Sequence, residues 1–573
     1  MNDTIAQIRS AQLVTTFGIG SIVDAPECSI MIAGQDEWRS DRTDVIHEPR
    51  LQRRLGVSEF RLPKVCRRVS SGGHQEPAVP AVRFPLWHFC PGCHRLAELR
   101  DFGGTKETIC RACSATGAEQ QLVPARFIVA CDQGHIADFP WHWWVHRGAT
   151  CLKAELEIRA SGRSTTLGSI IVRCRTCDLE RTMEGVFDPV EIVQVRCPGH
   201  RPWLRDRVTC GNQLRVLQRG ASNVYFAHTE SAVSIPPFSS LSAKIVEKYW
   251  TGLTLSDDPE DSRGLLKSIA KKEKADSDDL WTAFNARLKY GTSGPTPDLR
   301  LDEYQVLSSP PSMNDKDDFA AEKVAVPAMH PWLDCVVLVH RLRVVTALSG
   351  FTRLQAAGGQ MAELSRGPQD WFPAMEVHGE GVFLRPSGDA LREWKRRAGS
   401  ALDRRVALLE TRRQRLLNSG LRTREAPISA EFLLLHTLSH LLMRALTLEC
   451  GYSSAALREI VYVREATKES GAMNGLLIYT ASADSEGSLG GLVRQGHPSR
   501  LGPVLSEAIE SARWCSNDPL CLESESQGMN SLNLSACHSC ALVPETACET
   551  YNGFLDRGVL VGTEGEPTLA FIT

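Results

Sequence analysis

The spacing of apolar residues indicates a chain that mixes strands and helices. Residues 1 to about 85 alternate short apolar runs with glycine and proline turns, and residues 12–23 have the pattern of a strand, a glycine turn and a second strand. Residues 389–425 instead repeat apolar side chains at a helical period of about 3.6. That stripe contains Leu391, Trp394, Ala398, Leu402, Leu409 and Leu416. The apolar run at residues 475–480 predicts a strand, so the fold class expected is mixed α+β.

Changes in composition along the 573 residues predict several domains. The divisions expected are a β-rich segment at 1–85, a cysteine-rich region with zinc-binding modules at 86–235, a helical insert with a loose loop at 236–330, a middle region with a basic helix at 331–425, and a C-terminal domain at 426–573. The aromatic stretch at residues 138–144 is either a platform for unpaired bases or a core cluster that braces a zinc module, and we favour the core cluster.

The 19 cysteines are the strongest chemical signal in the chain. The sequence has no basic, apolar leader at its start and no apolar stretch near the ~20 residues of a membrane span, so we expect a cytoplasmic protein without membrane contact. Disulfides do not persist in that compartment. Several cysteines form C-x-x-C pairs, whose two thiolates can reach one tetrahedral Zn²⁺. The spacing therefore predicts zinc as the cofactor.

The first predicted site is a pair of such motifs. Cys90 and Cys93 are followed, 16 residues later, by Cys110 and Cys113. The turn formers Pro91 and Gly92 lie between the first two cysteines, as in a zinc knuckle. This spacing is typical of a zinc ribbon and predicts a four-thiolate site.

A second site is predicted from Cys174 and Cys177, completed by Cys197 and Cys210. Three candidate ligands remain, and these are Cys131, His135 and Cys151. Cys131 and His135 have a C-x3-H spacing, but three ligands do not close a structural site. A fourth ligand would come from Cys210, His200 or elsewhere. The alternative is a buried thiol beside a core histidine.

A third site is predicted near the C-terminus. Five thiols compete there for four positions, and the expected ligands are Cys521, Cys537, Cys540 and Cys548. Cys515 is the expected spare, and it stays a possible ligand.

Net charge is −3, which excludes a uniformly basic nucleic-acid binder but leaves room for a local basic surface. The polar face of the helix expected at 389–425 is such a surface. Its candidate DNA-binding residues are Arg396, Arg397, Arg404, Arg405, Arg412, Arg413 and Arg415. These side chains either neutralise DNA phosphates or face water or an acidic partner, and the sequence does not separate the two readings.

Known catalytic motifs are missing from the sequence. It contains no G-x-x-x-x-G-K-[ST] nucleotide loop, no G-x-S-x-G elbow and no kinase motif set, so no ATPase, esterase or kinase activity is expected. His436 and His440 stand four residues apart, but no H-E-x-x-H protease motif is present, and helix packing or a local hydrogen bond is the expected role. Asp484 and Glu486 are acidic residues beside glycines that either bind a metal or form a tight loop.

The motifs in their order resemble a known family. His436–His440, Ile478–Thr480, Asp518–Cys521, Ala536–Cys540, Cys548 and Leu555–Arg557 resemble the MrfA-like zinc-binding domain. Most of the remaining chain resembles the DrmB family of the DISARM antiphage system. The segments that carry this resemblance include residues 12–38, 131–141, 219–226, 234–236, 350–353 and 373–383.

The resemblance implies a function that spacing alone does not reveal. DrmB-like proteins pair with DrmA, a superfamily 2 helicase, and handle invading DNA with single-stranded 5′ ends. The expected function is therefore a zinc-stabilised, non-catalytic, DNA-binding partner of a helicase that supplies the ATPase. Two alternatives stay open. One is a metal-dependent nuclease that uses Asp484, Glu486 or the Cys131–His135 site, and the other is a scaffold that contacts only protein.

Overall fold

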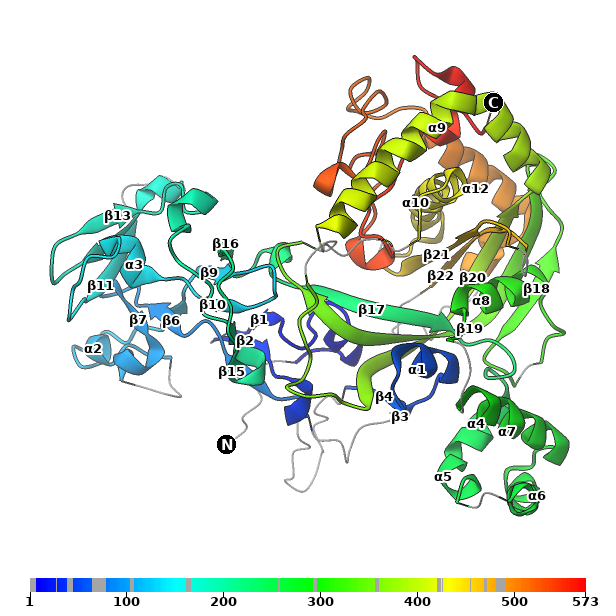
Figure 1. The fold of residues 1–573 in the computed structure, drawn as a ribbon, viewed down its shortest axis with the longest axis horizontal. Helices are drawn as coiled ribbons and strands as arrows, with labels where there is room; N and C mark the ends of the chain where they lie inside the picture. Colours follow the sequence, from blue (N-terminus) through cyan, green and yellow to red (C-terminus); the bar gives the residue numbers. More distant parts are fainter. Residues whose placement is uncertain are drawn as a thin grey trace. The chain divides into compact units, whose positions relative to one another are not determined.

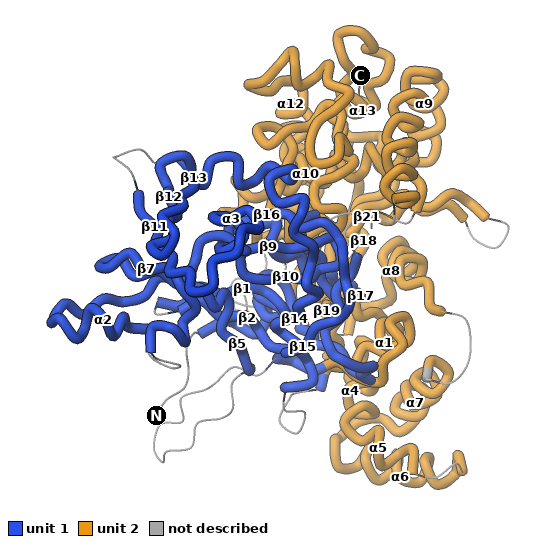
Figure 2. Tube along the Cα trace, turned by 60° about the vertical axis from the view of Figure 1, so that its left-hand side comes forward, with its two compact units in different colours: residues 1–45, 61–230, 347–375 blue, residues 46–60, 231–346, 376–573 orange. Residues whose placement is uncertain are grey.

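A computed structural model describes residues 7–26, 28–38, 45–63, 79–103, 108–160, 166–255, 258–291, 296–314, 316–355, 360–419, 424, 426–453, 455–467, 471–480 and 491–572. The described chain mixes helices and sheets, as the sequence predicted, and it divides into two compact units (Figure 2). Unit 1 comprises residues 1–45, 61–230 and 347–375, and unit 2 comprises residues 46–60, 231–346 and 376–573. Both units are therefore assembled from segments far apart in sequence. The division into five consecutive segments stays a prediction.

Unit 1 consists mainly of short antiparallel strands. A six-stranded sheet has the order β13-β12-β11-β7-β6-β8, and two three-stranded sheets have the orders β1-β2-β5 and β10-β9-β16. The elements are β1 (Ile22–Asp24), β2 (Ser29–Ile32), β5 (Ala81–Arg83), β6 (Trp87–Phe89), β7 (Arg95–Glu98), α2 (Arg111–Ser114), β8 (Val123–Pro124), β9 (Phe127–Ala130), β10 (Ile136–Asp138), α3 (Trp141–His146), β11 (Leu156–Ala160), β12 (Ile170–Cys174), β13 (Glu180–Thr182), β14 (His200–Arg201), β15 (Asp206–Arg207) and β16 (Arg215–Gln218).

Unit 2 contains the long helices. Its elements are α1 (Pro49–Leu55), α4 (Leu241–Lys248), α5 (Trp250–Leu253), α6 (Pro259–Glu273), α7 (Ser277–Gly291), α8 (Leu299–Ser308), β18 (Ala320–Val324), α9 (Gly388–Asn418), α10 (Ala430–Cys450), β21 (Leu457–Arg464), β22 (Met473–Thr480), α11 (Gly491–Gly496), α12 (Pro498–Ser511) and α13 (Gly558–Val561). The chain passes between the units within or beside β3 (Val45–Ile46), β4 (Glu59–Arg61), β17 (Phe226–Val233), β19 (Leu333–Thr352) and β20 (Trp371–Pro386).

The core of unit 1 is aromatic. Trp141 and Trp144 of α3 are 1% and 0% exposed, and they pack with Phe127 and Phe139 around the cysteine-rich strands. Side chains buried in this way have no face free for a base, because stacking needs an accessible ring. Trp141 and Trp144 therefore belong to a core cluster, as we favoured from the sequence, and Trp143 of the same stretch is half-buried against it.

Helix α10 forms the centre of unit 2. It packs against α9, α12 and the strands β21 and β22 (Figure 1). Strands β20 and β22 pair antiparallel, with Val382 opposite Ile478, and β22 pairs in turn with β21. Residues 432–443 of α10 are buried on all sides, so the polar residues among them lie inside the core, whereas Arg444 and Glu449 near the C-terminal end are exposed. This placement matters for His436 and His440, which both belong to α10.

Two predicted elements differ in detail from the observed ones. The predicted helix at 389–425 is confirmed as α9, but it ends at Asn418 and is broken at Gly399, whose φ of 50° and ψ of −132° are not helical. The strand predicted to begin at Gln12 is wrong, because residues 10–13 form a 3₁₀ turn and the first strand among the described residues is β1. No helix in the described part of the chain combines the length and apolar character needed to span a bilayer.

Candidate metal centres

Four groups of Cys and His side chains come together in the structure with the geometry of metal sites. In each group one possible ligand atom per residue lies within 4.8 Å of all the others. Tetrahedral zinc with Zn–S bonds of about 2.3 Å places its sulfur atoms about 3.8 Å apart. We name the groups by their first residue as the Cys90, Cys131, His146 and Cys515 sets.

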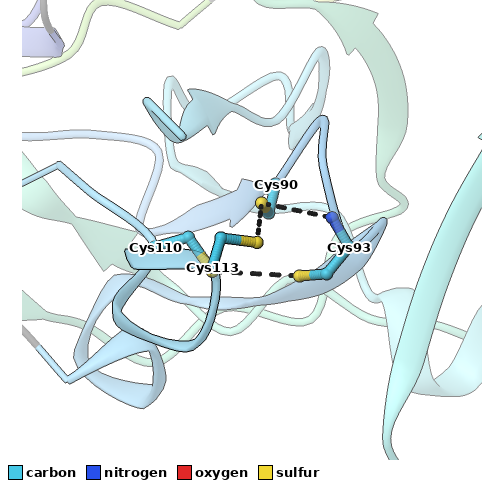
Figure 3. A group of neighbouring side chains, drawn as sticks. All are labelled: Cys90, Cys93, Cys110 and Cys113. Carbon is cyan, nitrogen blue, oxygen red and sulfur yellow. Dashed lines mark hydrogen bonds between the residues drawn. The ribbon is translucent and has the colours of Figure 1, made fainter. Parts of the chain in front are cut away.

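The Cys90 set contains the four cysteines of the first predicted site. Figure 3 shows their side chains pointing toward one another. The Sγ atoms of Cys90 and Cys113 are 3.6 Å apart, and those of Cys93 and Cys110 are 3.8 Å apart. The turn after β6 is tight because the His94 N–H donates to the Cys90 carbonyl oxygen. The backbone N–H of Cys93 also donates to Cys90 Sγ, as expected for a thiolate ligand in a knuckle.

The Cys131 set corrects the predicted grouping. Cys197 and Cys210 do not join Cys174, but lie with Cys131 and His135. His135 Nδ1 is 3.5 Å from Cys131 Sγ and 3.7 Å from Cys197 Sγ. The four residues therefore form a closed Cys₃His set, in which Cys210, one of the fourth ligands considered from the sequence, joins Cys131 and His135, and Cys151 does not. The sequence did not reveal this grouping because Cys131 and His135 are more than 60 residues from Cys197 and come near it only in the folded chain.

Arg353 braces the hairpin that carries Cys131 and His135. This side chain is 0% exposed, and its guanidinium donates to the carbonyl oxygens of Gly134, Val224 and Gly20. Burial lowers the pKa of Arg353 to about 9. Gly134 has a φ of +76°, which suits glycine, and a Cβ there would lie 2.6 Å from that of Ala362. The hairpin is thus held from two sides.

The His146 set uses the remaining cysteines of this region. It contains His146, Cys151, Cys174 and Cys177. Cys177 Sγ is 3.3 Å from His146 Nε2, and Cys151 Sγ is 3.9 Å from Cys174 Sγ. His146 Nδ1 contacts the His142 carbonyl oxygen at 2.7 Å, so it carries the proton and leaves Nε2 available as a ligand. The sequence reading missed His146, although its H-x4-C spacing to Cys151 is a usable signal.

The Cys515 set differs from the prediction by one residue. Cys515, the expected spare, lies with Cys521, Cys537 and Cys540, and its Sγ is 3.5 Å from Cys537 Sγ. Cys521 and Cys540 have their Sγ atoms 3.8 Å apart. Cys548 is absent from this set and lies beside His436 instead, with 3.2 Å between Sγ and Nε2. The assignment of Cys548 to this site is therefore corrected.

The pKa values of the thiols are unequal within these sets. Burial raises the pKa of the Cys113 thiol to about 12. Burial acts in the same direction on Cys537, but hydrogen bonds, first of all from the Asn517 amide, outweigh it and hold that pKa at about 6. Four thiols this close do not all ionise without a compensating cation. A divalent metal would supply that charge and hold all four as thiolates.

The seven candidate arginines divide into buried and exposed side chains. Arg405 and Arg413 are 7% and 2% exposed. Arg405 pairs with Asp556 at 2.7 Å, and Arg413 pairs with Glu410 at 2.7 Å. A phosphate does not reach either guanidinium, so their prediction as DNA contacts is wrong.

The other five arginines are at least partly accessible. Arg397 donates to the carbonyl oxygens of Ala570 and Phe571, and Arg412 to those of Glu525 and Ser531. Arg396 pairs with Glu393 and Arg404 with Glu566, both at the surface. Arg415 is exposed as well. Asp484 and Glu486, the acids of the nuclease alternative, lie outside the described residues.

Among the comparisons with known proteins, one family match bears on these metal centres. Residues 9–226 match a family described as a domain of unknown function (DUF8724), and residues 438–541 match the MrfA Zn-binding domain. The DISARM protein DrmB of Bacillus paralicheniformis is 31% identical over 587 aligned positions, which cover 94% of this chain and 98% of that protein. The crystal structure of the DUF1998 helicase MrfA bound to DNA matches 38% of this chain and 22% of its own, with 12% identity and a TM-score of 0.18. The chain belongs to the DrmB family of DISARM proteins.

Proposed function

We propose that this chain is a zinc-stabilised, non-catalytic partner of a DrmA-like superfamily 2 helicase and binds DNA that carries single-stranded 5′ ends. The observation that carries the proposal is the similarity to a DISARM protein along nearly the full length of both chains. A match of that extent makes a shared role in the defence system the simplest reading. The helicase supplies the ATPase in this proposal, in keeping with the missing nucleotide loop in the sequence.

Zinc fits the four sets by ligand type and distance. Two sets offer four sulfur atoms and two offer three sulfur atoms and one imidazole nitrogen, which are the usual ligands of structural zinc. When bound, the ion cross-links segments of the chain and balances the charge of the thiolates. Each set already has four protein ligands, so no position is left for a substrate or an activated water. This supports a structural role for zinc and a non-catalytic role for the chain.

The DNA contact is proposed for the exposed face of α9. Arg396 and Arg404 are 74% and 64% exposed, and their surface ion pairs are worth at most about 1 kcal/mol each. A phosphate can therefore replace the glutamate partner at little cost. Arg415 lies on the same helix and is exposed. Arg396, Arg404 and Arg415 are therefore the proposed DNA contacts. Phosphates can bind them while the buried ion pairs of Arg405 and Arg413 stay intact.

The proposal is tested by co-purifying the chain with its helicase and measuring affinity for 5′-overhang DNA over a range of salt concentrations. Charge reversal in Arg396→Glu, Arg404→Glu and Arg415→Glu together should weaken binding and reduce the slope of log affinity against log salt by about 2. A matched control reverses Lys267, Lys271 and Lys272 on α6, which are also exposed and basic, and should leave both quantities unchanged.

Other outcomes separate the competing functions. Unchanged affinity and slope in the arginine variant would favour a scaffold without DNA contact through α9. A complex in which this chain alters neither DNA affinity nor DNA-stimulated ATPase contradicts the proposed function as a whole. Cleavage of labelled DNA by the pure chain with Mg²⁺ or Mn²⁺ would contradict the non-catalytic role.

A further inference from the structure

A group of ionisable side chains lies in the core of unit 2, where none was expected. His436 and His440 stand one turn apart on α10, with exposed fractions of 1% and 0%. Both rings direct Nε2 at one carboxylate oxygen of Glu459 on β21, at 3.0 Å and 3.2 Å. Cys548 Sγ lies 3.2 Å from the same Nε2 atom of His436. Helix packing alone does not explain four ionisable groups gathered in a dry interior, because each carries a desolvation cost.

The surrounding backbone fixes how these groups present their atoms. His436 Nδ1 is 3.2 Å from the Phe554 carbonyl oxygen, and His440 Nδ1 is 3.0 Å from that of Ala541. A carbonyl oxygen only accepts hydrogen bonds, so both Nδ1 atoms carry the proton. In the neutral rings, each Nε2 then directs a lone pair toward the centre of the group. Metal-binding histidines are oriented in this way.

The other two groups are arranged in the same manner. Cys548 Sγ accepts hydrogen bonds from the backbone N–H groups of Thr550 and Asn552, at 3.4 Å and 3.3 Å, which favours the thiolate. The remaining carboxylate oxygen of Glu459 accepts a hydrogen bond from the Ser439 hydroxyl. The four groups therefore place two nitrogen lone pairs, one carboxylate oxygen and one sulfur around a common centre. Without a cation at that centre, these electron-rich atoms repel one another.

We propose that His436, His440, Glu459 and Cys548 bind a further structural zinc ion. The four candidate ligand atoms lie within 4.8 Å of one another, and all four residues are buried. Zn²⁺ with one carboxylate, one thiolate and two neutral imidazoles has no net charge, which suits a core without water. Nitrogen and sulfur ligands exclude Ca²⁺ and Mg²⁺, which take oxygen. Four protein ligands close a tetrahedral site, so the role is structural.

This site is separate from the four sets described above. It shares no residue with the Cys515 set, and two of its ligands, His436 and Cys548, lie outside residues 438–541 that match the MrfA Zn-binding domain. The ion would join α10, β21 and the segment around Cys548, which are about 110 residues apart at the extremes. The inference depends neither on DNA binding nor on a helicase partner.

The first test measures zinc per chain in the full-length protein by elemental analysis. Cys548→Ser should lose one equivalent of zinc, whereas Cys548→His, which replaces one zinc ligand by another, should keep it. Cys335→Ser is the matched control, because Cys335 is also a buried thiol (0% exposed) but lies in none of the metal sets. The proposal is overturned if Cys548→Ser retains the zinc content of the unaltered chain. That result would leave a metal-free cluster of two imidazolium ions with Glu459 and Cys548.

A second measurement uses the unaltered protein and does not depend on the folding of a variant. When cadmium replaces zinc, its NMR shift moves downfield with each sulfur ligand. The other four sets have three or four sulfur atoms each, and the proposed site has one. A resonance well upfield of the rest is therefore expected. A spectrum that contains only signals of sites with three or four sulfur atoms would contradict the proposal.

Discussion

At the scale of single residues, the same side-chain type has opposite roles along one helix. Arg405 and Arg396 both lie on α9, but Arg405 is buried against Asp556, which is itself 0% exposed, while Arg396 is in solvent. Two hydrogen bonds join the Arg405 guanidinium to both carboxylate oxygens of Asp556, and a third reaches Ser535. Part of the basic stripe predicted from the sequence therefore forms buried ion pairs that stabilise the fold, and only the rest is exposed to solvent.

Arg405→Ala should lower the free energy of unfolding by about 3–5 kcal/mol, because it leaves the buried Asp556 carboxylate without a partner. Arg396→Ala, at the surface of the same helix, should change it by no more than about 0.5 kcal/mol. Denaturant titration followed by circular dichroism measures both. Equal effects of the two substitutions would contradict the distinction drawn between them.

The residue scale also shows what the sequence could predict about the sites. Cys90, Cys93, Cys110 and Cys113 lie within 24 consecutive positions, and local spacing was enough to group them. The set of Cys131, His135, Cys197 and Cys210 and the exchange of Cys548 for Cys515 were not predictable in this way. The members of these sets come together through strand pairing and helix packing between distant segments. The spacing of cysteines along the sequence does not reveal such long-range contacts.

At the scale of elements, periodicity predicted the long helix correctly but not its break. The apolar stripe continues across Gly399, so the pattern gives no sign of a change in direction. Gly399 adopts a φ of 50° with a ψ of −132°, which is strained for any residue with a Cβ. Strand β22 was predicted from the short apolar run at residues 475–480, and the structure shows that this run is buried on both faces. At residues 10–13 the prediction from pattern failed, because the chain forms a 3₁₀ turn where the apolar pattern is typical of a strand.

The break in α9 predicts whether alanine at position 399 stabilises or destabilises the protein. Gly399→Ala should destabilise the protein by about 1–3 kcal/mol, because alanine does not fit the backbone conformation there. In a regular helix the same change would stabilise by about 1 kcal/mol. Gly264→Ala in α6, where the added methyl group meets open space, is the control and should stabilise. Thermal unfolding of both variants is the measurement, and stabilisation by Gly399→Ala would show that α9 is continuous.

At the scale of the whole molecule, the proposed zinc ions would couple metal binding to folding. Three of the four thiol-rich sets lie in unit 1, where the sheets are built from strands of two to five residues. Sheets of such short strands have few ladder hydrogen bonds each, and metal cross-links at their turns would add to the stability that the aromatic core supplies. A metal ion in the Cys515 set would likewise cross-link the loops that follow α12.

Lowering the pH from about 7 to about 5 should release zinc and lower the unfolding temperature together. The ligand thiolates and imidazoles must lose protons to bind the metal, so affinity falls as the proton concentration rises. Excess zinc should restore the unfolding temperature by mass action. Differential scanning calorimetry with parallel zinc analysis checks this. An unfolding temperature that is independent of zinc at both pH values would contradict a structural role for the ions.

The interleaved segments of the two units have a consequence for synthesis on the ribosome. Unit 1 begins with residues 1–45 and is completed only by residues 347–375, with residues 46–60 and 231–346 of unit 2 made in between. At about 5–20 residues per second, roughly 15–60 s pass between the emergence of residue 45 and that of residue 347. The Cys90 set can close within the first seconds of that interval, because its ligands are near neighbours in the chain. We therefore expect the supply of metal during translation to determine whether these four cysteines are bound early or stay as free thiols until unit 1 is complete.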